Sequence, residues 1–138
     1  KRSKSLKEAP ADIARLSFLV IEDEAFSRTI VKRTLGAMGV TDVATANNGI
    51  EALAHLVKST PPDVMLVDII MPEMGGPELL RHLAERNYPG AIILVSGTHK
   101  DTIAVAESLA NYRELNVLGH IVKPMTANAL NGLLAKLE

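Results

Sequence analysis

The sequence contains no cysteine and no long apolar run. Without cysteine the chain can have neither a disulfide framework nor a thiolate metal site, and a cytoplasmic location is compatible with this. A membrane-spanning helix needs about 18 consecutive apolar residues, no stretch approaches that length, and no signal-peptide pattern precedes the first predicted strand. The formal net charge is only −1. We therefore expect a cytoplasmic protein that binds neither nucleic acid directly nor a membrane.

The length and composition of the chain indicate one folded domain. The 138 residues are 47% hydrophobic and 22% charged, which is ordinary for a globular protein large enough to bury its own core. Residues 1–14 lack helical or strand periodicity, begin with several basic side chains and contain Pro10. We predict a solvated tail or linker over residues 1–14 and the folded domain over residues 15–138.

Five short apolar runs, bounded by turn residues, predict β-strands. The run between Pro62 and Pro72 is apolar at both alternating faces, which is typical of a strand buried on both sides of a parallel sheet. The predicted strands cover residues 16–21, 42–46, 64–68, 91–95 and 117–122.

Apolar residues recur at helical spacing after each strand, which predicts five helices. Asn47 or Asn48 can cap the second helix, Pro77 suits the first turn of the third, and Thr126 can cap the last. The stripes expected to face the core are Phe26, Ile30, Val31, Leu35 and Met38; Ile50, Leu53, Ala54 and Val57; Leu79, Leu80 and Leu83; Ile103, Ala106, Leu109 and Ala110; and Leu130, Leu133, Leu134 and Leu137.

Strands that alternate with helices in this way indicate a doubly wound α/β fold built on a parallel sheet. Crossovers between parallel strands are right-handed, so few topologies remain. For a five-stranded (βα)5 sheet we predict the flavodoxin-like strand order 2-1-3-4-5.

Polar side chains follow four of the five predicted strands. Glu22 and Asp23 follow the first, Asp68 ends the third, Ser96 follows the fourth and Lys123 follows the fifth. In the predicted order these strands are neighbours, and open parallel sheets bind their ligands beyond the carboxyl ends of the strands. Burying an unpaired carboxylate is costly, so Asp68 is interpreted as a reactive or metal-binding group.

The residue types at this edge indicate phosphoryl chemistry with a metal. Carboxylate oxygens without histidine or cysteine favour Mg²⁺, and a carboxylate can also act as a nucleophile to form an aspartyl phosphate. An ammonium group and a hydroxyl group would then hold the phosphoryl oxygens.

Longer segments around these residues carry a family resemblance, which spans about residues 16–137 and is specific because the segments occur together. They are Leu19–Glu24, Ala46–Leu53, Asp63–Gly76, Ser96–Thr98 and Val122–Pro124. In these segments the chain resembles the receiver domain of two-component response regulators, the fold of the chemotaxis regulator.

The resemblance implies a phosphoacceptor and its metal. Asp68 would accept a phosphoryl group from a sensor histidine kinase or a histidine phosphotransfer protein. Mg²⁺ would be bound by Glu22 and Asp23, directly or through water, together with Asp68 and the backbone carbonyl of Ile70.

The resemblance also implies two groups that respond to the phosphoryl group. Ser96 matches the hydroxyl that hydrogen-bonds the phosphoryl oxygens and moves on activation. Lys123 matches the invariant lysine of the family, and the bond between Lys123 and Pro124 is expected to be cis.

Three features depart from the family pattern. The aromatic switch position, usually Tyr or Phe, is His120, which either fills the same space or swings inward with Ser96 and makes output depend on pH near 6 to 7. Ile70 stands where relatives often carry Asn, so we expect slow autodephosphorylation. The segment over residues 109–116 is longer than usual, which predicts a longer fourth helix or loop, or a specialised partner interface.

The function expected from these residues is a phosphorylation-dependent signalling switch of a two-component system. Phosphorylation of Asp68 would alter the face formed by the last two helices and the last strand, which would act on an output domain or protein. The chain would not be an enzyme beyond Mg²⁺-dependent self-phosphorylation and autodephosphorylation, and a homodimer stays open. The alternatives are a phosphorylation-independent binding module with a receiver fold and a Mg²⁺-dependent phosphohydrolase. The phosphohydrolase is disfavoured because the residues after Asp68 lack the DxDxT pattern.

Overall fold

A five-stranded parallel sheet forms the middle of the domain. The computed structural model describes residues 13–71, 73–98 and 101–137. The strand order is β2-β1-β3-β4-β5, which confirms the predicted doubly wound, flavodoxin-like topology. The strands are β1 (Ser17–Ile21), β2 (Asp42–Ala46), β3 (Val64–Asp68), β4 (Ala91–Ser96) and β5 (Asn116–Val122).

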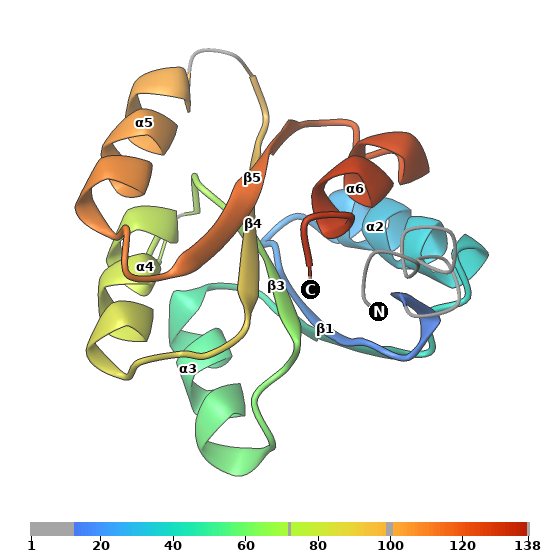
Figure 1. Cartoon of the computed structure of the whole chain (residues 1–138), viewed down its shortest axis with the longest axis horizontal. Coiled ribbons are helices and arrows are strands. Elements are labelled where there is room, and N and C mark those ends of the chain that lie inside the picture. The colour runs from blue at the N-terminus through green and yellow to red at the C-terminus, as the bar shows by residue number, and fades with distance from the viewer. Residues whose placement is uncertain (1–12, 72, 99–100, 138) are drawn as a thin grey trace.

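Helices cover both faces of the sheet (Figure 1). One face packs against α2 and α6, and the other packs against α3, α4 and α5, so the core is divided into two apolar clusters. Every residue of β3 and β4 is buried, as expected for central strands enclosed by two helical layers. The helices are α2 (Ala25–Ala37), α3 (Gly49–Lys58), α4 (Gly76–Glu85), α5 (Thr102–Asn111) and α6 (Ala127–Leu134).

Local sequence signals determine where several helices begin. The side chain of Asn48 accepts a hydrogen bond from the Glu51 amide, and the side chain of Thr126 accepts one from the Ala129 amide. Each bond satisfies an amide that the first helical turn would otherwise leave without a partner. Pro77 lies in the first turn of α4, as predicted. Within the described residues, no helix has both the length and the apolar character needed to cross a membrane.

The predicted stripe of α5 is wrong, and in the stripe of α3 Leu53 packs against the core as predicted while other members do not. Ile50 and Val57 of α3 are 55% and 79% exposed, and Ala52 faces the core instead. On α5, Ile103 is 71% exposed, while Val105 and Ser108 are buried. The helical spacing predicted that larger apolar side chains lie inward, whereas the buried residues of these helices include Ala52, Val105 and Ser108.

The other three stripes are largely confirmed. The stripes of α4 and α6 pack into the core, as do Val31 and Leu35 of α2. Phe26 is the exception, since it is 71% exposed at the start of α2. It lies beside an apolar hollow of about 240 Å³, whose lining residues are Phe26, Ser27, Ile30, Val31, Val95, Lys123, Pro124 and Met125.

The segment over residues 109–116 covers the end of α5, a turn and the start of β5, and its extra length relative to the family stays a prediction. Helix α5 ends at Asn111, a turn follows, and β5 already begins at Asn116. Ile13, which the sequence analysis placed in the tail, is only 3% exposed and belongs to the core cluster that includes Phe18. Residues 1–12 lie outside the described part of the chain, so the boundary between tail and domain stays a prediction.

At Gly76, the start of α4 packs closely against the loop that follows β3. The Gly76 amide donates to the Ile69 carbonyl at 3.0 Å. A Cβ added at Gly76 would lie 2.8 Å from Ile69 Cα and 3.0 Å from the Asp68 carbonyl oxygen. We expect Gly76→Ala to lower the free energy of unfolding by about 1–3 kcal/mol, because backbone atoms must move apart. Urea unfolding measures the change.

Gly36 of α2 provides the matched control for that substitution. A Cβ at Gly36 would meet no atom within 4 Å. Gly36→Ala should therefore raise the free energy of unfolding by about 0.5–1 kcal/mol, because alanine restricts the unfolded chain and favours helix. Equal effects of the two substitutions would contradict the role given to Gly76.

Candidate functional site

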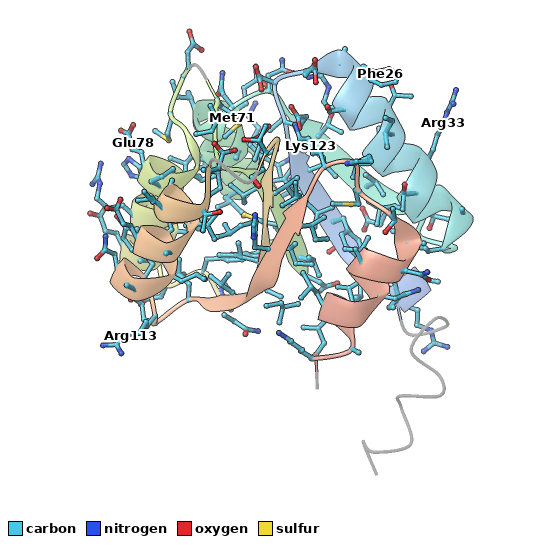
Figure 2. All side chains as sticks on the ribbon, turned by 90° about the horizontal axis from the view of Figure 1, so that it is seen from above. Phe26, Arg33, Met71, Glu78, Arg113 and Lys123 are labelled. Carbon is cyan, nitrogen blue, oxygen red and sulfur yellow. The ribbon has the colours of Figure 1, made fainter. Side chains whose placement is uncertain are left out.

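The predicted polar residues converge at the carboxyl edge of the sheet. Residues Ile21 and Val67 are paired in neighbouring strands, as are Asp68 and Val95, so the groups that follow them share one edge. Figure 2 shows Lys123 at the end of the domain opposite to Arg113. The parallel strands therefore bring together residues that lie far apart in the sequence.

Lys123 joins the two buried acids of this edge. Its Nζ lies 2.6 Å from Glu22 Oε1 and 3.1 Å from Asp68 Oδ2. The side chains of Glu22 and Asp68 are only 4% and 5% exposed. The cis bond expected between Lys123 and Pro124 is present. One ammonium group thus acts as the counter-ion for two buried carboxylates.

The pKa values of Glu22 and Lys123 are both raised, but for different reasons. Burial raises the pKa of Glu22 above its usual value, against the lowering effect of its bonds to Lys123 and to the Glu24 amide. For Lys123, burial acts to lower the pKa, but the hydrogen bonds and negative charges of Glu22 and Asp68 outweigh it and raise the pKa. The acids are therefore only partly compensated by the lysine, which favours a further cation.

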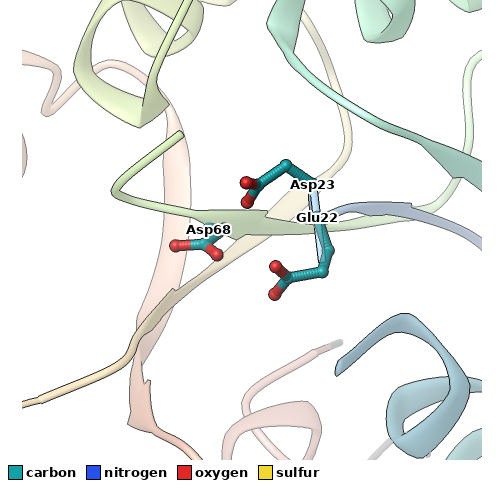
Figure 3. Close-up of side chains that lie close together, drawn as sticks. All are labelled: Glu22, Asp23 and Asp68. Carbon is teal, nitrogen blue, oxygen red and sulfur yellow. The ribbon is translucent and has the colours of Figure 1, made fainter. Parts of the chain in front are cut away.

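Three carboxylates could hold that cation. One oxygen each from Glu22, Asp23 and Asp68 lie within 4.8 Å of one another (Figure 3). Asp23 is exposed while the other two are buried, so the cluster is closed on one side and open to solvent on the other. A donor set made only of carboxylates fits Mg²⁺, which takes one or two protein carboxylates and keeps several waters.

Glu24 does not belong to this cluster. Its carboxylate accepts a hydrogen bond from Ser27 Oγ at 2.7 Å, at the exposed start of α2. The Glu24 amide instead donates to Glu22 Oε2 at 3.1 Å. The backbone of Glu24 thus helps to orient Glu22, while its side chain points elsewhere.

Two further contacts fix the backbone around the acids. Ile70 donates its amide to Asp68 Oδ1 at 3.0 Å, which holds the start of the loop after β3 against the Asp68 carboxylate. Arg28 of α2 donates to the Glu22 carbonyl at 2.8 Å. Sequence reasoning missed Arg28; a basic residue one turn into the helix that follows the acids was the available signal.

Ser96 and His120 are in direct contact. Ser96 Oγ lies 2.8 Å from His120 Nε2 and 3.3 Å from the Thr98 carbonyl oxygen. Ser96 is fully buried, and His120 is half-buried on the neighbouring strand β5. The hydroxyl predicted to meet a phosphoryl group is therefore already bonded to the residue at the predicted switch position.

Comparison with known proteins identifies the family. Residues 18–135 match the family model of the response regulator receiver domain. The chain belongs to the response regulator receiver family.

Chemotaxis and transcriptional regulatory proteins that are similar in sequence agree with this family assignment. The receiver domain is 34% identical over 116 residues to a chemotaxis protein CheY homolog of Campylobacter jejuni, covering 83% of this chain and 86% of the relative. It is 30% identical to the chemotaxis protein CheY1 of Helicobacter pylori, covering 83% of this chain and 90% of that one. It also resembles the transcriptional regulatory protein DegU of Brevibacillus brevis (33% identity), covering 84% of this chain but only 47% of DegU.

Solved structures show the same fold. A response regulator receiver domain protein from Clostridium thermocellum superposes with a TM-score of 0.74 at 26% identity, covering 86% of this chain and 90% of that one. The BeF3-activated receiver domain of nitrogen regulatory protein C superposes with a TM-score of 0.65 at 31% identity, covering 87% and 91%. The chain is thus a two-component signalling domain, which confirms the general class of the predicted function. Receiver domains are signalling modules rather than enzymes in the usual sense.

Proposed function

We propose that this receiver domain is a phosphorylation-dependent switch in which Asp68 accepts a phosphoryl group from a sensor histidine kinase or a histidine phosphotransfer protein. The observation that carries the proposal is the position of the Asp68 carboxylate. It is buried, it is bonded to Lys123, and it lies within one cluster with Glu22 and Asp23.

The expected reaction is a transfer between two nucleophiles. A carboxylate oxygen of Asp68 attacks phosphorus, a P–O bond to Asp68 forms, and the P–N bond to the donor histidine breaks, with its electron pair returning to the donor imidazole. Lys123 would remain close to the transferred group and neutralise its oxygens. Glu22, Asp23 and Asp68 would hold Mg²⁺, with the Ile70 carbonyl as a further ligand. When bound, Mg²⁺ would supply positive charge next to the phosphoryl oxygens.

Two solved relatives support the choice of phosphoryl group and metal. The nitrogen regulatory protein C receiver is described as BeF3 activated, and a CheY of Borrelia burgdorferi is described in a complex with CheX, BeF3 and Mg²⁺. BeF3 resembles a phosphoryl group in shape and charge. We propose that the same chemistry applies at Asp68.

The output surface would be the face formed by α5, β5 and α6. Ser96 lies at the end of β4 and bonds to His120 of β5, so a change at Ser96 reaches this face through one contact. We propose that an output domain or a separate protein binds there. A second copy of the chain could bind at the same face and form a homodimer.

The test is chemical phosphorylation. We expect the protein, incubated with Mg²⁺ and acetyl phosphate, to gain the mass of one phosphoryl group. Asp68→Asn should abolish the gain, because an amide cannot act as the nucleophile. Intact-mass spectrometry gives the measurement.

Asp42→Asn is the matched control, since Asp42 is an exposed acid on the edge strand β2. It should gain the phosphoryl group as the wild type does. Absence of any gain in the wild-type protein would favour the alternative function, a receiver fold that binds its partner without phosphorylation. Gain by Asp68→Asn would place the acceptor elsewhere.

Ile70 is expected to prolong the phosphorylated state. Its side chain is 59% exposed next to Asp68 and cannot orient an attacking water by hydrogen bonding. Ile70→Asn should shorten the phosphoryl half-life by about tenfold, equivalent to ~1.4 kcal/mol in the barrier. The half-life is followed by intact mass after removal of acetyl phosphate. Ile70→Val, which stays apolar, is the control, and equal half-lives for the Asn and Val variants would refute the role of the side chain.

A further inference from the structure

The hydrogen bond between Ser96 and His120 restricts where protons can lie. Ser96 has one hydroxyl proton, and two neighbours compete for it: the Thr98 carbonyl oxygen at 3.3 Å and His120 Nε2 at 2.8 Å. The carbonyl can only accept, whereas the imidazole nitrogen can either accept or donate. If Ser96 donates to the imidazole, Nε2 is unprotonated; if Ser96 donates elsewhere, Nε2 must carry a proton to keep the bond.

A phosphoryl group on Asp68 would decide between these arrangements. Phosphoryl oxygens only accept hydrogen bonds, so a bond from Ser96 to the phosphoryl group consumes the hydroxyl proton. His120 can then stay bonded to Ser96 Oγ only as a donor through Nε2–H. Both the neutral Nε2–H tautomer and the imidazolium can donate this bond. The imidazolium is favoured because it also brings a positive charge toward the added negative charge.

We propose that His120 is a positioning residue for the Ser96 hydroxyl and takes up one proton from solvent when Asp68 is phosphorylated. The proposal rests on the proposed function of Asp68, and it makes phosphorylation and protonation mutually reinforcing. Acid conditions then stabilise the phosphorylated form, and phosphorylation moves the titration of His120 to higher pH. The linkage must be reciprocal, because both effects express one coupling free energy.

Few other charges can account for such a shift. Strand β4 contains no ionisable residue, and neither does α6. Lys136, just after α6, donates to the Leu118 carbonyl of β5 at 2.8 Å and does not change when Asp68 is modified. On α5 and at its start, the described acids are Glu107, which is exposed, and Asp101, which is half-buried, and neither forms an ion pair with His120 in the part of the chain that the structure describes. On β5 and just after it, the nearest other ionisable group is Lys123, whose ammonium is engaged by Glu22 and Asp68. A change in His120 titration therefore reports mainly on the group added at Asp68.

The test uses the full chain with ¹³C-labelled histidine, Mg²⁺ and beryllofluoride, a phosphoryl mimic, observed by NMR between about pH 5 and 9. The signal of His120 is assigned by its loss in His120→Tyr. We expect beryllofluoride to move the titration midpoint of His120 upward by about one pH unit, a tenfold gain in proton affinity. His55 and His82, which lie on α3 and α4, serve as internal references and should move by less than ~0.2 unit.

Two variants separate positioning from space filling. In the wild type, beryllofluoride should bind up to about tenfold more tightly at pH 5.5 than at pH 8, relative to His120→Phe at the same two pH values. His120→Tyr retains a hydroxyl that can donate to Ser96 but does not titrate in this range, so it should keep the affinity and lose the pH difference.

The outcomes separate this inference from the function on which it rests. Binding of beryllofluoride without an upward shift of His120, or an equal pH difference in the wild type and His120→Phe, overturns the proton uptake and leaves the role of Asp68 intact. Failure of the wild type to bind beryllofluoride at all overturns both.

Discussion

Replacing Lys123 with methionine is expected to lower the free energy of unfolding by about 3–5 kcal/mol in the absence of Mg²⁺. Lys123 Nζ is bonded to Glu22 at 2.6 Å and to Asp68 at 3.1 Å, and both side chains are almost completely buried. Methionine fills a similar volume but leaves two adjacent carboxylates without a counter-ion. Urea unfolding followed by circular dichroism measures the loss.

Mg²⁺ should restore a large part of that stability. In the variant the cation would replace the positive charge that Lys123 supplied to Glu22 and Asp68, so the increase in melting temperature on adding Mg²⁺ should exceed that of the wild type. Phosphorylation by acetyl phosphate should still be greatly slowed, because no ammonium group remains to neutralise the phosphoryl oxygens.

The pH dependence of the variant follows from the sign of the Glu22 shift. Burial raises the pKa of Glu22, and Lys123 opposes that rise, so removal of the lysine raises the pKa further. A carboxyl group whose folded-state pKa is raised contributes most stability below its unfolded value and loses it as pH rises through the folded value. The deficit of Lys123→Met should therefore be largest near neutral pH and shrink as pH falls toward about 4.5, the usual value for Glu.

Lys32→Met is the matched control. Lys32 is exposed on α2, and among the described residues it forms no ion pair, so its replacement should change the free energy of unfolding by no more than about 0.5 kcal/mol. A loss of similar size in the two variants would show that the effect comes from lysine content rather than from the buried cluster.

The positions of the acids, the hydroxyl and the lysine could be predicted from the sequence because they depend only on the order of the strands along the chain. Each residue follows a short apolar run, and parallel strands place their carboxyl ends at one edge. The strand order β2-β1-β3-β4-β5 then made Glu22, Asp68, Ser96 and Lys123 neighbours, as the structure confirms. No side-chain detail was required.

What could not be predicted depends on packing between elements. The buried residues of α3 and α5 include Ala52, Val105 and Ser108. Periodicity alone does not determine which side of a helix faces the sheet, so the prediction that Ile50 and Ile103 lie inward is wrong.

The hydrogen bond between Ser96 and His120 could not be predicted from the sequence either. A hydrogen bond across 24 positions of sequence depends on the rotamers of both side chains and on the register of β4 against β5. The sequence alone predicts a His120 ring that either fills space or swings inward. The observed bond at 2.8 Å places the ring next to Ser96.

Glu22→Gln is expected to weaken Mg²⁺ binding by about 10–100-fold. Glu22 supplies one of the three carboxylates that lie within 4.8 Å of one another, and its amide substitute carries no charge. Stabilisation by a bound ligand depends on its concentration relative to the dissociation constant. The rise in melting temperature with added Mg²⁺ should therefore require 10–100-fold more metal in the variant, as ~1.4–2.7 kcal/mol of lost binding free energy implies. Calorimetric titration measures the affinity directly.

Glu24→Gln separates the cluster from the general acidity of this segment. The Glu24 carboxylate lies two residues away but is bonded to Ser27 rather than directed into the cluster. Glu24→Gln changes the net charge of the protein by the same amount as Glu22→Gln, so the two variants have the same long-range electrostatic effect on Mg²⁺. Mg²⁺ affinity in Glu24→Gln should remain within about twofold of the wild type, since exposed charges outside the site are screened. A comparable loss in both variants would mean that Mg²⁺ responds to the whole acidic segment.

The pH profile provides the decisive comparison between these two variants. A metal ligand must be deprotonated, so protons compete with Mg²⁺ for the cluster. Because burial raises the pKa of Glu22 above its usual 4.5, wild-type affinity should begin to fall at a higher pH than an exposed glutamate would allow. Glu24→Gln should keep that profile, whereas Glu22→Gln should show a flatter one over the same range. If the profile of Glu22→Gln is as steep as that of the wild type, the proton competing with Mg²⁺ is bound by another group of the cluster, and Glu22 acts only as a partner of Lys123.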